Sequence, residues 1–455
     1  MQAPRRLRAQ YLEADGGDRQ FQGWFDTELA TPCAFGRADD GALYCLPIVP
    51  DLMFYGDSNC ATPIYVPDCG TEAARFVRST EVGPLQGDAC FRYYESHSTF
   101  REVIGPRRET STTYYFHQPG TCQLNLQGQA IKPFFALSEP VANTRFVRAT
   151  RVMEPRTERV SAIVLVAEDG ARQDVGIYDH SVEAQCSPTP PTCRPYDGTV
   201  GHDRGGPFRY DATCQHRVAN IPADFCPPQA IVINVVDATG CSYATEIREV
   251  VEEIPASQVK TLNANGECVA SEPSASTRAY ALGALMTDRY SFLDVRTDGP
   301  ARLQAATLES NGARFSLVSD DFIDTQRGIA CRLIPQNPER LLCVAPNEQP
   351  LSEWTAFTDA SCTIPAALLL EREDGCPSIP AYQVRSVYQG CGVDPLLEIR
   401  PVLGVLQAPA FELRNGACAR LDPATYATPG YRPLLHALGE PVDLSTWPSV
   451  RRVTE

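Results

Sequence analysis

The feature that most constrains this chain is a segment of sequence that occurs three times. The start of Arg6–Pro47 aligns without a gap with Arg159–Cys186, and with small insertions it aligns with Arg302–Cys331. The shared positions are an opening arginine, a turn glycine and an aspartate seven residues before a cysteine: Arg6, Arg159 and Arg302; Gly17, Gly170 and Gly312; Asp26, Asp179 and Asp324. Such self-similarity is the signature of a repeat architecture. We therefore expect three units, at residues 1–155, 156–300 and 301–455. No Gly/Ser-rich linker separates them, which favours one closed or tightly stacked body over separate domains on linkers.

The cysteines follow the same repeat. The chain has 18 cysteines and no CxxC motif, so disulfides are favoured over metal–thiolate clusters, and with them an oxidising compartment. An aspartate precedes the third cysteine of each unit by three positions, at Asp57, Asp211 and Asp359. Each unit has six cysteines: Cys33, Cys45, Cys60, Cys69, Cys90 and Cys122; Cys186, Cys193, Cys214, Cys226, Cys241 and Cys268; Cys331, Cys343, Cys362, Cys376, Cys391 and Cys418.

Six cysteines allow 15 connectivities, so the sequence leaves the pairing open. Sequential pairing is our expectation. Cys33 and Cys45 flank the turn at Asp39–Gly41 symmetrically, and Cys331 and Cys343 have the same spacing, as hairpin partners would. On the same reasoning we expect Cys60–Cys69, Cys214–Cys226 and Cys362–Cys376 bridges, with the fifth and sixth cysteines of each unit joined to each other.

The local pattern is that of an all-β protein. Polar and apolar residues alternate over Arg6–Tyr11, whereas Ala162–Val166 and Ala230–Val236 are apolar runs typical of buried strands. Asp-Gly and Asn-Gly pairs mark tight hairpin turns, as at Asp169–Gly170 and Asn311–Gly312. The 38 prolines disfavour helices. We expect almost no helix. Ala424–Tyr426 is a candidate short helix, which the nearby prolines disfavour.

A finer period also runs through the chain. A strand, a tight turn and a second strand recur nine times, beginning at residues 11, 54, 114, 165, 208, 261, 308, 356 and 411. This gives nine sub-units of about 50 residues, the size of a four-stranded propeller blade. The most favoured architecture is therefore a β-propeller. Three tandem β-trefoil or barrel-like domains are the alternative, followed by sandwiches or another β architecture.

Gly23–Leu29, Cys33, Asp40–Gly41, Cys45–Pro47 and Asp57 before Cys60 together resemble a family of cysteine-rich repeat proteins. The family consists of secreted or lipid-anchored surface proteins common in myxobacteria. The resemblance covers all three units and is sharpest in the first. The second unit departs from it, because Cys186 and Cys193 lie closer together and lack the Asp-Gly hairpin between them. The resemblance implies an exported bacterial protein of unknown function and supplies no catalytic residues.

Few residues in the sequence indicate a catalytic or metal-binding site. The GxSxG, HExxH, P-loop and GxGxxG motifs are missing, and the six histidines (His97, His117, His180, His202, His216 and His436) lack metal-ligand spacing. The repeated aspartates could be calcium ligands, but turn formation explains their recurrence better. Acidic pairs such as Asp39–Asp40, Asp320–Asp321 and Glu252–Glu253 could suggest a glycosidase, although surface pairs are mostly solvated. We predict no catalytic, cofactor-binding or metal-binding residue.

Aromatic residues offer a further possibility. Trp24, Trp354, Trp447, Tyr114–Phe116 and Phe134–Phe135 could stack on sugar rings, although at strand positions they more often pack the core.

Charge and targeting signals narrow the functional classes. The formal net charge of −16 disfavours binding to nucleic acid or anionic lipid. The N-terminal residues lack the apolar region of a signal peptide, so an exported precursor is expected to carry a targeting or anchor segment missing here, and no apolar run is long enough for a membrane helix. We expect an extracellular or outer-surface scaffold that binds a protein or polysaccharide. The alternative is a secreted glycoside hydrolase or lyase with its site at a propeller channel.

Overall fold

The computed structural model confirms the all-β class. It describes residues 6–51, 54–67, 74–87, 92–108, 115–118, 121–124, 134–187, 194–195, 200–202, 209–216, 218–223, 227–236, 243–262, 267–270, 276–286, 289–291, 293–297, 299–316, 322–337, 339–345, 350–351, 356–372, 380–387, 396–414, 417–426 and 431–455. In these ranges, helical structure is confined to short 3-10 turns such as η1 (Asn143–Arg145) and η4 (Pro423–Tyr426). The second of these turns lies where the sequence suggested a short helix.

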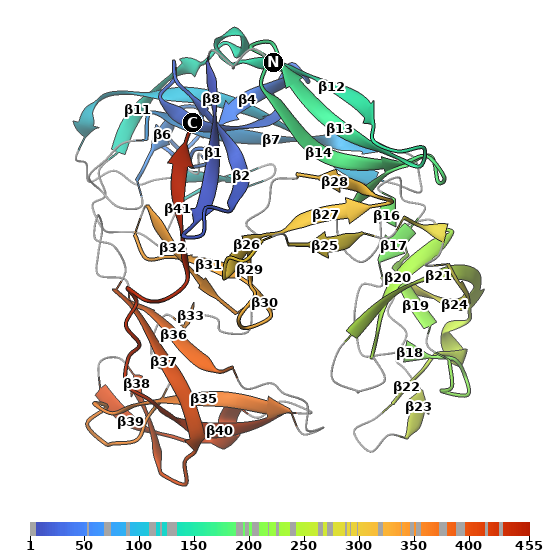
Figure 1. The fold of residues 1–455 in the computed structure, drawn as a ribbon, viewed down its shortest axis with the longest axis vertical. Helices are drawn as coiled ribbons and strands as arrows, with labels where there is room; N and C mark the ends of the chain where they lie inside the picture. Colours follow the sequence, from blue (N-terminus) through green and yellow to red (C-terminus); the bar gives the residue numbers. More distant parts are fainter. Residues whose placement is uncertain are drawn as a thin grey trace.

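The three units meet in a central group of strands, which we call the frame (Figure 1). Twelve strands of the frame form one sheet in the order β16-β15-β14-β13-β12-β4-β3-β2-β1-β41-β32-β31. These strands are β1 (Leu7–Ala14), β2 (Arg19–Asp26), β3 (Thr31–Arg37), β4 (Leu43–Pro47), β12 (Arg148–Pro155), β13 (Val160–Ala167), β14 (Arg172–Asp179), β15 (Ala184–Ser187), β16 (Arg194–Pro195), β31 (Arg332–Pro335), β32 (Arg340–Val344) and β41 (Ser449–Thr454).

The rest of the frame comes from the third unit and from the strand before it. Two three-stranded sheets have the orders β25-β27-β28 and β26-β29-β30. Their strands are β25 (Asp294–Arg296), β26 (Leu303–Ala305), β27 (Thr307–Ser310), β28 (Ala313–Phe315), β29 (Phe322–Asp324) and β30 (Ile329–Ala330).

The last strand of one unit joins it to the next. β12, at the end of the first unit, pairs with β4 of its own unit and with β13 of the second unit. β41, at the end of the third unit, pairs with β32 of its own unit and with β1 of the first unit. β25, at the end of the second unit, pairs with β27 of the third unit. The frame therefore connects the chain's last strand back to its first.

Three hydrophobic cores show the same cyclic order. The first-unit core combines Leu7 and Trp24 with Ala167 and Ala171 of the second unit. In the second-unit core, Val160 and Ile177 pack against Phe315 of the third unit. The third-unit core contains Leu303 and Phe322 and is completed by Leu12 and Ala14 of the first unit. The hydrophobic core of each unit is completed by residues of the next unit, and the core of the third is completed by the first. The three units therefore depend on one another to bury their apolar side chains.

The turn between the first two strands of a unit also reaches its neighbour. The Asp169 carboxylate in the second unit accepts a hydrogen bond from the backbone N–H of Leu7 at 2.7 Å. Asn311 of the third unit donates to the hydroxyl of Ser291 at 3.1 Å. Gly16 of the first unit lies so close to the third unit that an added Cβ would be 2.4 Å from the Cβ of Ala301. This close approach explains why the first turn has glycine at position 16.

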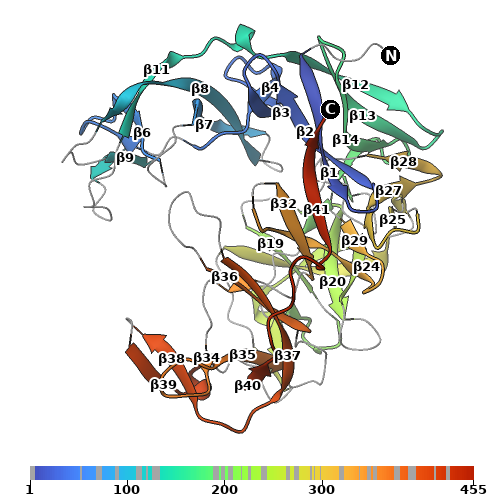
Figure 2. The same ribbon diagram turned by 60° about the vertical axis from the view of Figure 1, so that its left-hand side comes forward.

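Each unit extends from the frame as an arm. Figure 1 shows the second and third arms projecting apart, and Figure 2 shows the first and third arms projecting in different directions. The first arm consists of β5 (Phe54–Tyr55), β6 (Pro63–Tyr65), β7 (Phe76–Gly87), β8 (Arg92–Arg108), β9 (Tyr115–Gln118), β10 (Thr121–Leu124) and β11 (Phe134–Pro140). The second consists of β17 (Val200–His202), β18 (Arg209–Tyr210), β19 (Val218–Pro222), β20 (Ala230–Val236), β21 (Tyr243–Ile254), β22 (Lys260–Leu262), β23 (Cys268–Ala270) and β24 (Thr277–Leu285). The third consists of β33 (Pro350–Leu351), β34 (Ala356–Phe357), β35 (Pro365–Arg372), β36 (Tyr382–Val387), β37 (Leu396–Val405), β38 (Ala410–Arg414), β39 (Ala417–Leu421) and β40 (Tyr431–Leu438).

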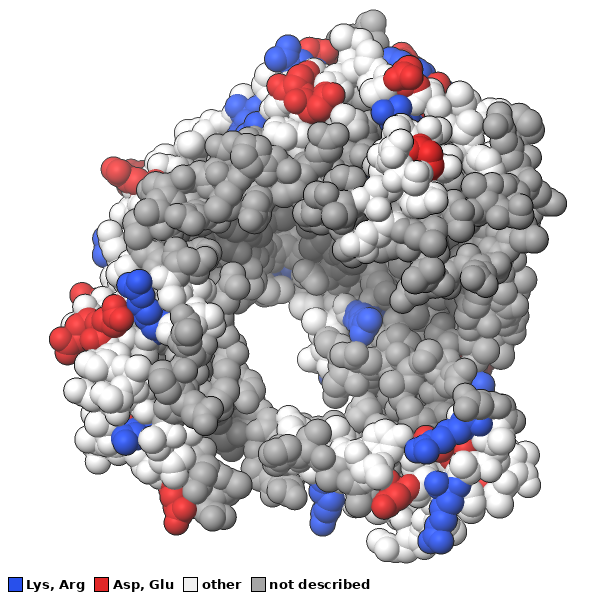
Figure 3. Space-filling model, turned by 180° about the vertical axis from the view of Figure 1, so that it is seen from behind, with Lys and Arg blue, Asp and Glu red and all other residues white. Residues whose placement is uncertain are grey.

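The three arms are built alike. A long hairpin (β7–β8, β20–β21 or β36–β37) pairs with the last strand of the arm (β11, β24 or β40), which also pairs with β6, β19 or β35. Seen from behind, the space-filling view has an opening through the molecule, and acidic and basic side chains lie near one another at the outer margins of the molecule (Figure 3). The molecule is therefore an open assembly of arms on a frame.

Most of the predicted hairpins are present, whereas the predicted propeller is not identified among the described strands. Antiparallel pairing occurs at eight of the nine predicted hairpins, for example β1–β2, β13–β14 and β27–β28. In the ninth, β18 pairs instead with β22 of the same arm. The described strands do not form a series of four-stranded blades, because strands of neighbouring units join edge to edge in the twelve-stranded sheet. No closed propeller is therefore identified among them.

The disulfides correct part of the predicted pairing. Cys33–Cys45 and Cys331–Cys343 are present, as the hairpin spacing predicted. The Cys60–Cys69, Cys214–Cys226 and Cys362–Cys376 pairings are wrong, because the third cysteine of each unit is bonded to the sixth, as Cys60–Cys122, Cys214–Cys268 and Cys362–Cys418. The fifth-to-sixth pairing is wrong for the same reason. Cys186 is also disulfide-bonded, whereas Cys69, Cys90, Cys193, Cys226, Cys241, Cys376 and Cys391 lie outside the described residues.

Candidate functional site

The repeated aspartates Asp26, Asp179 and Asp324 form one type of buried ionic contact. Each is fully buried and pairs with the opening arginine of its unit, at 2.8 Å for Arg6, 3.4 Å for Arg159 and 2.9 Å for Arg302. Each also accepts hydrogen bonds from the backbone of the turn that follows, as Asp26 does from Glu28 and Leu29. A buried carboxylate with these partners is satisfied as a structural anchor.

The second ionic contact has an additional link between elements. Asp179 accepts hydrogen bonds from the backbone N–H and the hydroxyl of Ser291, which precedes the third unit. Burial raises the pKa of Asp179, but hydrogen bonds from Ser181, Ser291 and Arg159 outweigh burial and hold that pKa below its usual value. The carboxylate is therefore held in its ionised form.

The aspartates before the third cysteines, Asp57, Asp211 and Asp359, shape a loop in each arm. Asp57 accepts hydrogen bonds from the backbone N–H groups of Asn59, Ala61 and Thr62, and its two counterparts accept equivalent bonds. The cysteine inside each loop has a positive φ, between 52° and 56°. This sparsely populated backbone conformation is held by the hydrogen bonds to the aspartate. The three aspartates therefore stabilise the conformation of these loops.

The histidines are not brought together into one site. His216 lies 3.1 Å from Asp211 in an exposed loop, and Nε2 of the exposed His180 lies 2.7 Å from the hydroxyl of Ser161. His436 is buried, and its Nδ1 lies 3.1 Å from the carbonyl oxygen of Leu403. The side chains of His117 and His202 are not among those described. In the described part of the chain, no three His, Cys, Asp or Glu residues are grouped as metal ligands.

The candidate acidic and aromatic residues are likewise dispersed. Asp40 accepts hydrogen bonds from the backbone of Ala42 and from the hydroxyl of Tyr44, while Glu252 and Glu253 are exposed on β21. Trp447 packs edge-on against Tyr382 and donates to the carbonyl oxygen of Cys343. Phe135 packs against Tyr65. Asp320–Asp321, Trp354 and Tyr114 lie outside the described residues.

A pocket of about 320 Å³ lies where the three units meet in the frame. Strands β1 and β2 of the first unit and β14 of the second contribute to its wall, together with residues of the third unit at β27 and after β28. The lining residues are Tyr11, Arg19, Gln20, Phe21, Trp24, Arg172, Gln173, Asp174, Thr307 and Ser316. Equivalent repeat positions carry different chemistry here, because Phe21 aligns with Asp174. The pocket is therefore asymmetric within a repeated frame.

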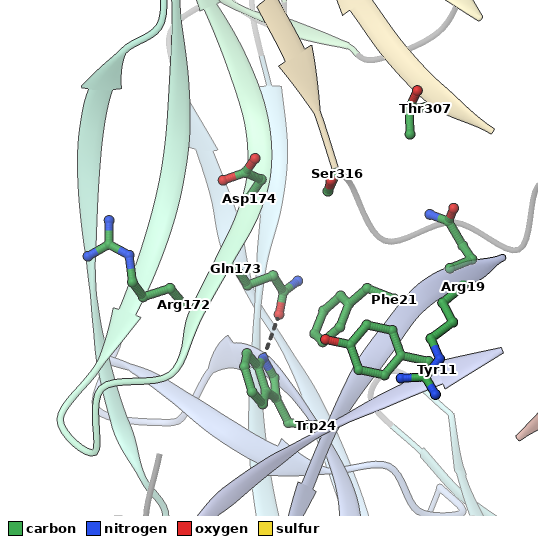
Figure 4. A pocket seen from close by; sticks show the side chains of 10 residues that line it. Tyr11, Arg19, Phe21, Trp24, Arg172, Gln173, Asp174, Thr307 and Ser316 are labelled. Carbon is green, nitrogen blue, oxygen red and sulfur yellow. Dashed lines mark hydrogen bonds between the residues drawn. The ribbon is translucent and has the colours of Figure 1, made fainter. Parts of the chain in front are cut away.

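The wall of the pocket has an aromatic part and a polar part (Figure 4). Tyr11, Phe21 and Trp24 lie together on one side, with edge-to-face ring contacts at 5.8 Å and 5.2 Å between centroids. Asp174, Thr307 and Ser316 lie across from them. Gln173 connects the two parts, because its Oε1 accepts a hydrogen bond from Nε1 of Trp24 at 3.1 Å.

The charged residues of the pocket are already paired. Arg19 donates to Glu13 and Glu455, and Arg172 donates to Glu154. Asp174 lies 3.3 Å from the guanidinium of Arg156. The hydrogen bonds to Glu13 and Glu455 raise the pKa of Arg19, so its charge is permanent. A pocket with neutralised charges and an aromatic wall suits an uncharged polar ligand better than an ion.

Sequence reasoning found one of these residues and missed the others. Trp24 is one of the aromatic residues that the sequence offers for sugar stacking, and the structure places it in the pocket wall. Tyr11, Gln173 and Ser316 gave no signal, since isolated polar residues on strands, or directly after one, have no spacing that marks a site. These residues face the place where the three units meet. Their position in the repeat is the signal by which they could have been identified.

Comparisons with known proteins give one match. The model of a family described as a family of unknown function (DUF7481) matches residues 3–445, which span all three units. No curated protein and no solved structure matches the chain. In the described residues, no helix is long and apolar enough to cross a membrane.

Proposed function

Because this chain belongs to the DUF7481 family, whose function is unknown, we propose its function from its own structure: it is an exported binding protein that acts at the cell surface. Five disulfides among the described residues support a location outside the reducing cytosol. The cyclically shared cores and the three buried Arg–Asp pairs support a rigid scaffold that carries arms and loops.

The residues that line the central pocket favour a binding function over glycoside hydrolysis. A glycoside hydrolase that uses two carboxylates needs an acid and a second carboxylate facing the same bond. The described residues that line the pocket include one carboxylate, that of Asp174, and it is ion-paired with Arg156. An aromatic and amide-rich pocket with a single paired carboxylate fits recognition of a ligand.

A binding measurement tests this proposal. The purified, oxidised protein is labelled and titrated onto cells of the organism that produces it and onto a panel of surface polysaccharides. Saturable binding that is lost after reduction and alkylation of the protein is the expected result. Release of shortened glycans from the panel would establish the enzyme instead, and a lack of binding to every cell and polysaccharide would overturn the binding function.

A further inference from the structure

The geometry points to the central pocket as a binding site for an uncharged mono- or disaccharide, with Tyr11, Gln173, Asp174 and Ser316 as its polar contacts and the Trp24–Phe21 wall as its apolar contact. This inference rests on the proposed binding function and specifies the ligand class and the residues.

The orientation of the Gln173 amide is set by its partner. The indole N–H of Trp24 is only a donor, so the amide oxygen of Gln173 must face it. At 3.1 Å this is a normal hydrogen bond. The amide NH2 group is consequently directed away from Trp24, and it has no partner among the described residues. The pocket therefore presents two N–H donors at a fixed position.

Other lining groups have unused hydrogen-bonding capacity. One carboxylate oxygen of Asp174 contacts Arg156, and the other has no partner in the described part of the chain. The hydroxyl groups of Tyr11 and Ser316 also lack partners within the described residues. Thr307 donates to the carbonyl oxygen of Arg296 at 3.3 Å and keeps its acceptor capacity. Donors and acceptors thus surround one space.

This combination matches the chemistry of a sugar. Each sugar hydroxyl both donates and accepts, so a ring with several hydroxyls can use an amide donor, a carboxylate acceptor and hydroxyl groups together. The C–H face of a pyranose is apolar and can contact the Phe21 and Trp24 rings. The volume of about 320 Å³ lies at the small end of ligand pockets. The paired arginines provide no free charge for an anionic ligand.

The test uses intrinsic tryptophan fluorescence, to which Trp24 contributes together with Trp354 and Trp447, and isothermal titration calorimetry on the full oxidised chain. The panel contains glucose, galactose, mannose, N-acetylglucosamine and their disaccharides, with glucuronate, glucose 6-phosphate and adenosine as chemically distinct arms. We expect saturable binding of at least one neutral saccharide. Binding of adenosine or of the anionic sugars without any neutral sugar would overturn the assignment of ligand class.

Gln173→Glu is the most informative variant. Glutamate keeps an oxygen that can accept from Trp24 but removes both N–H donors, so the local structure is retained while the predicted ligand contact is lost. We expect saccharide affinity to fall by at least about tenfold, the equivalent of one lost hydrogen bond. Gln258→Glu makes the same charge change in the exposed 3-10 turn η2 (Ala256–Gln258) and should leave affinity unchanged.

Tyr11→Phe is a second, milder variant. It removes one hydroxyl and keeps the aromatic wall, and we expect affinity to fall several-fold. Near-UV circular dichroism confirms that each variant retains its packing. Equal affinity of the wild type, Gln173→Glu and Tyr11→Phe would overturn the assignment of the pocket. If binding to cells persists while the pocket binds no saccharide, the proposed function stands and this inference fails.

Discussion

At the residue scale, the most informative feature is a buried carboxylate that recurs at the same position in all three units. Asp26, Asp179 and Asp324 are all inaccessible to solvent and are each matched by an arginine of the same unit. A buried carboxylate is tolerated only when paired and hydrogen-bonded. Its recurrence at one structural position explains the repeated aspartate without a catalytic or metal-binding role.

We predict that Asp26→Asn destabilises the protein by about 3 kcal/mol, at the low end of the range for breaking a buried pair. Asparagine has nearly the same shape but leaves the Arg6 guanidinium, which is 19% exposed, with only the exposed Glu28 carboxylate as a direct counter-charge. Urea unfolding followed by circular dichroism measures the loss.

Asp324→Asn should cost less than Asp26→Asn, because Arg302 is 41% exposed and keeps more of its hydration. Asp15→Asn, at an exposed turn position, is the matched control and should be neutral. If the change at Asp26 were as mild as the change at Asp15, the structural role of the pair would be refuted.

The loop aspartates predict a dependence on pH. Hydrogen bonds lower the pKa of all three carboxyls below the ordinary value of 3.8, from the backbone of Ala61 at Asp57, from the Thr213 hydroxyl at Asp211 and from the backbone of Ile364 at Asp359. A pKa that is lower in the folded state contributes stability above the unfolded value, and this contribution is lost as pH falls through the folded value.

Comparing the wild type with Asp57→Asn tests this dependence. The wild type should have the higher melting temperature at neutral pH. The difference should narrow as pH falls below about 4, where the Asp57 carboxyl of the unfolded chain begins to be protonated, and it should be lost once pH falls below the lowered pKa of the folded state. Differential scanning calorimetry from pH 7 to strongly acidic conditions measures it. A difference that stays constant over this range would show that the Asp57 charge contributes nothing.

At the scale of elements, the third-to-sixth disulfide links a loop of each arm to a hairpin that comes later in the same arm. In the first arm, Cys60 lies in the loop between β5 and β6, and Cys122 lies on β10. The residues are 62 positions apart, whereas Cys33 and Cys45 are 12 apart. The long-range bridge therefore closes a much larger loop in the unfolded chain than the hairpin bridge.

Chain-entropy arguments predict unequal effects of removing the two bridges. Loss of Cys60–Cys122 through Cys60→Ala and Cys122→Ala should cost about 4 kcal/mol, against about 3 kcal/mol for Cys33–Cys45. Guanidinium unfolding of both double variants measures the difference.

Peptide mapping without reduction checks the pairing directly. A fragment joining Cys60 to Cys122 is expected. A fragment joining Cys60 to Cys69 would contradict the structure.

At the scale of the whole molecule, the last strand, β41, joins the third unit to the first. β41 is hydrogen-bonded to β1 on one side and to β32 on the other, and Val450 is buried in the third-unit core. Arg451 on the same strand forms an ion pair with Glu13 of β1. The C-terminal residues thereby connect the first unit to the third.

We predict that removing residues 449–455 lowers the melting temperature and exposes β1 to solvent. The truncation leaves the edges of β1 and β32 unpaired and opens the core around Val450. Hydrogen exchange followed by mass spectrometry should show faster exchange over residues 7–14 and 340–344, with little change in the second arm at residues 243–254.

Deletion of Glu455 alone is the control for this truncation, since Glu455 contributes an exposed ion pair with Arg19. Unchanged protection of β1 in the longer truncation would show that the frame does not depend on its last strand.

The sequence alone determined the local structure. Alternation of polar and apolar residues, together with Asp-Gly and Asn-Gly turns, predicted strands and hairpins at β1–β2, β13–β14 and β27–β28, because these patterns act between neighbours in the chain. The same local logic predicted the Cys33–Cys45 and Cys331–Cys343 bridges. The repeat also identified Asp26 and its counterparts as structural residues.

Only the tertiary structure decided how these hairpins combine. Pairing of Cys60 with Cys122, of β41 with β1 and of Trp24 with Gln173 joins residues far apart in the chain, and no local pattern encodes such a distance. The hairpins can be assembled as separate blades or as sheets shared between units with the same local hydrogen bonds. The choice depends on which apolar faces bury one another, and here each unit's core is completed by residues of the next. The central pocket exists only because of that choice.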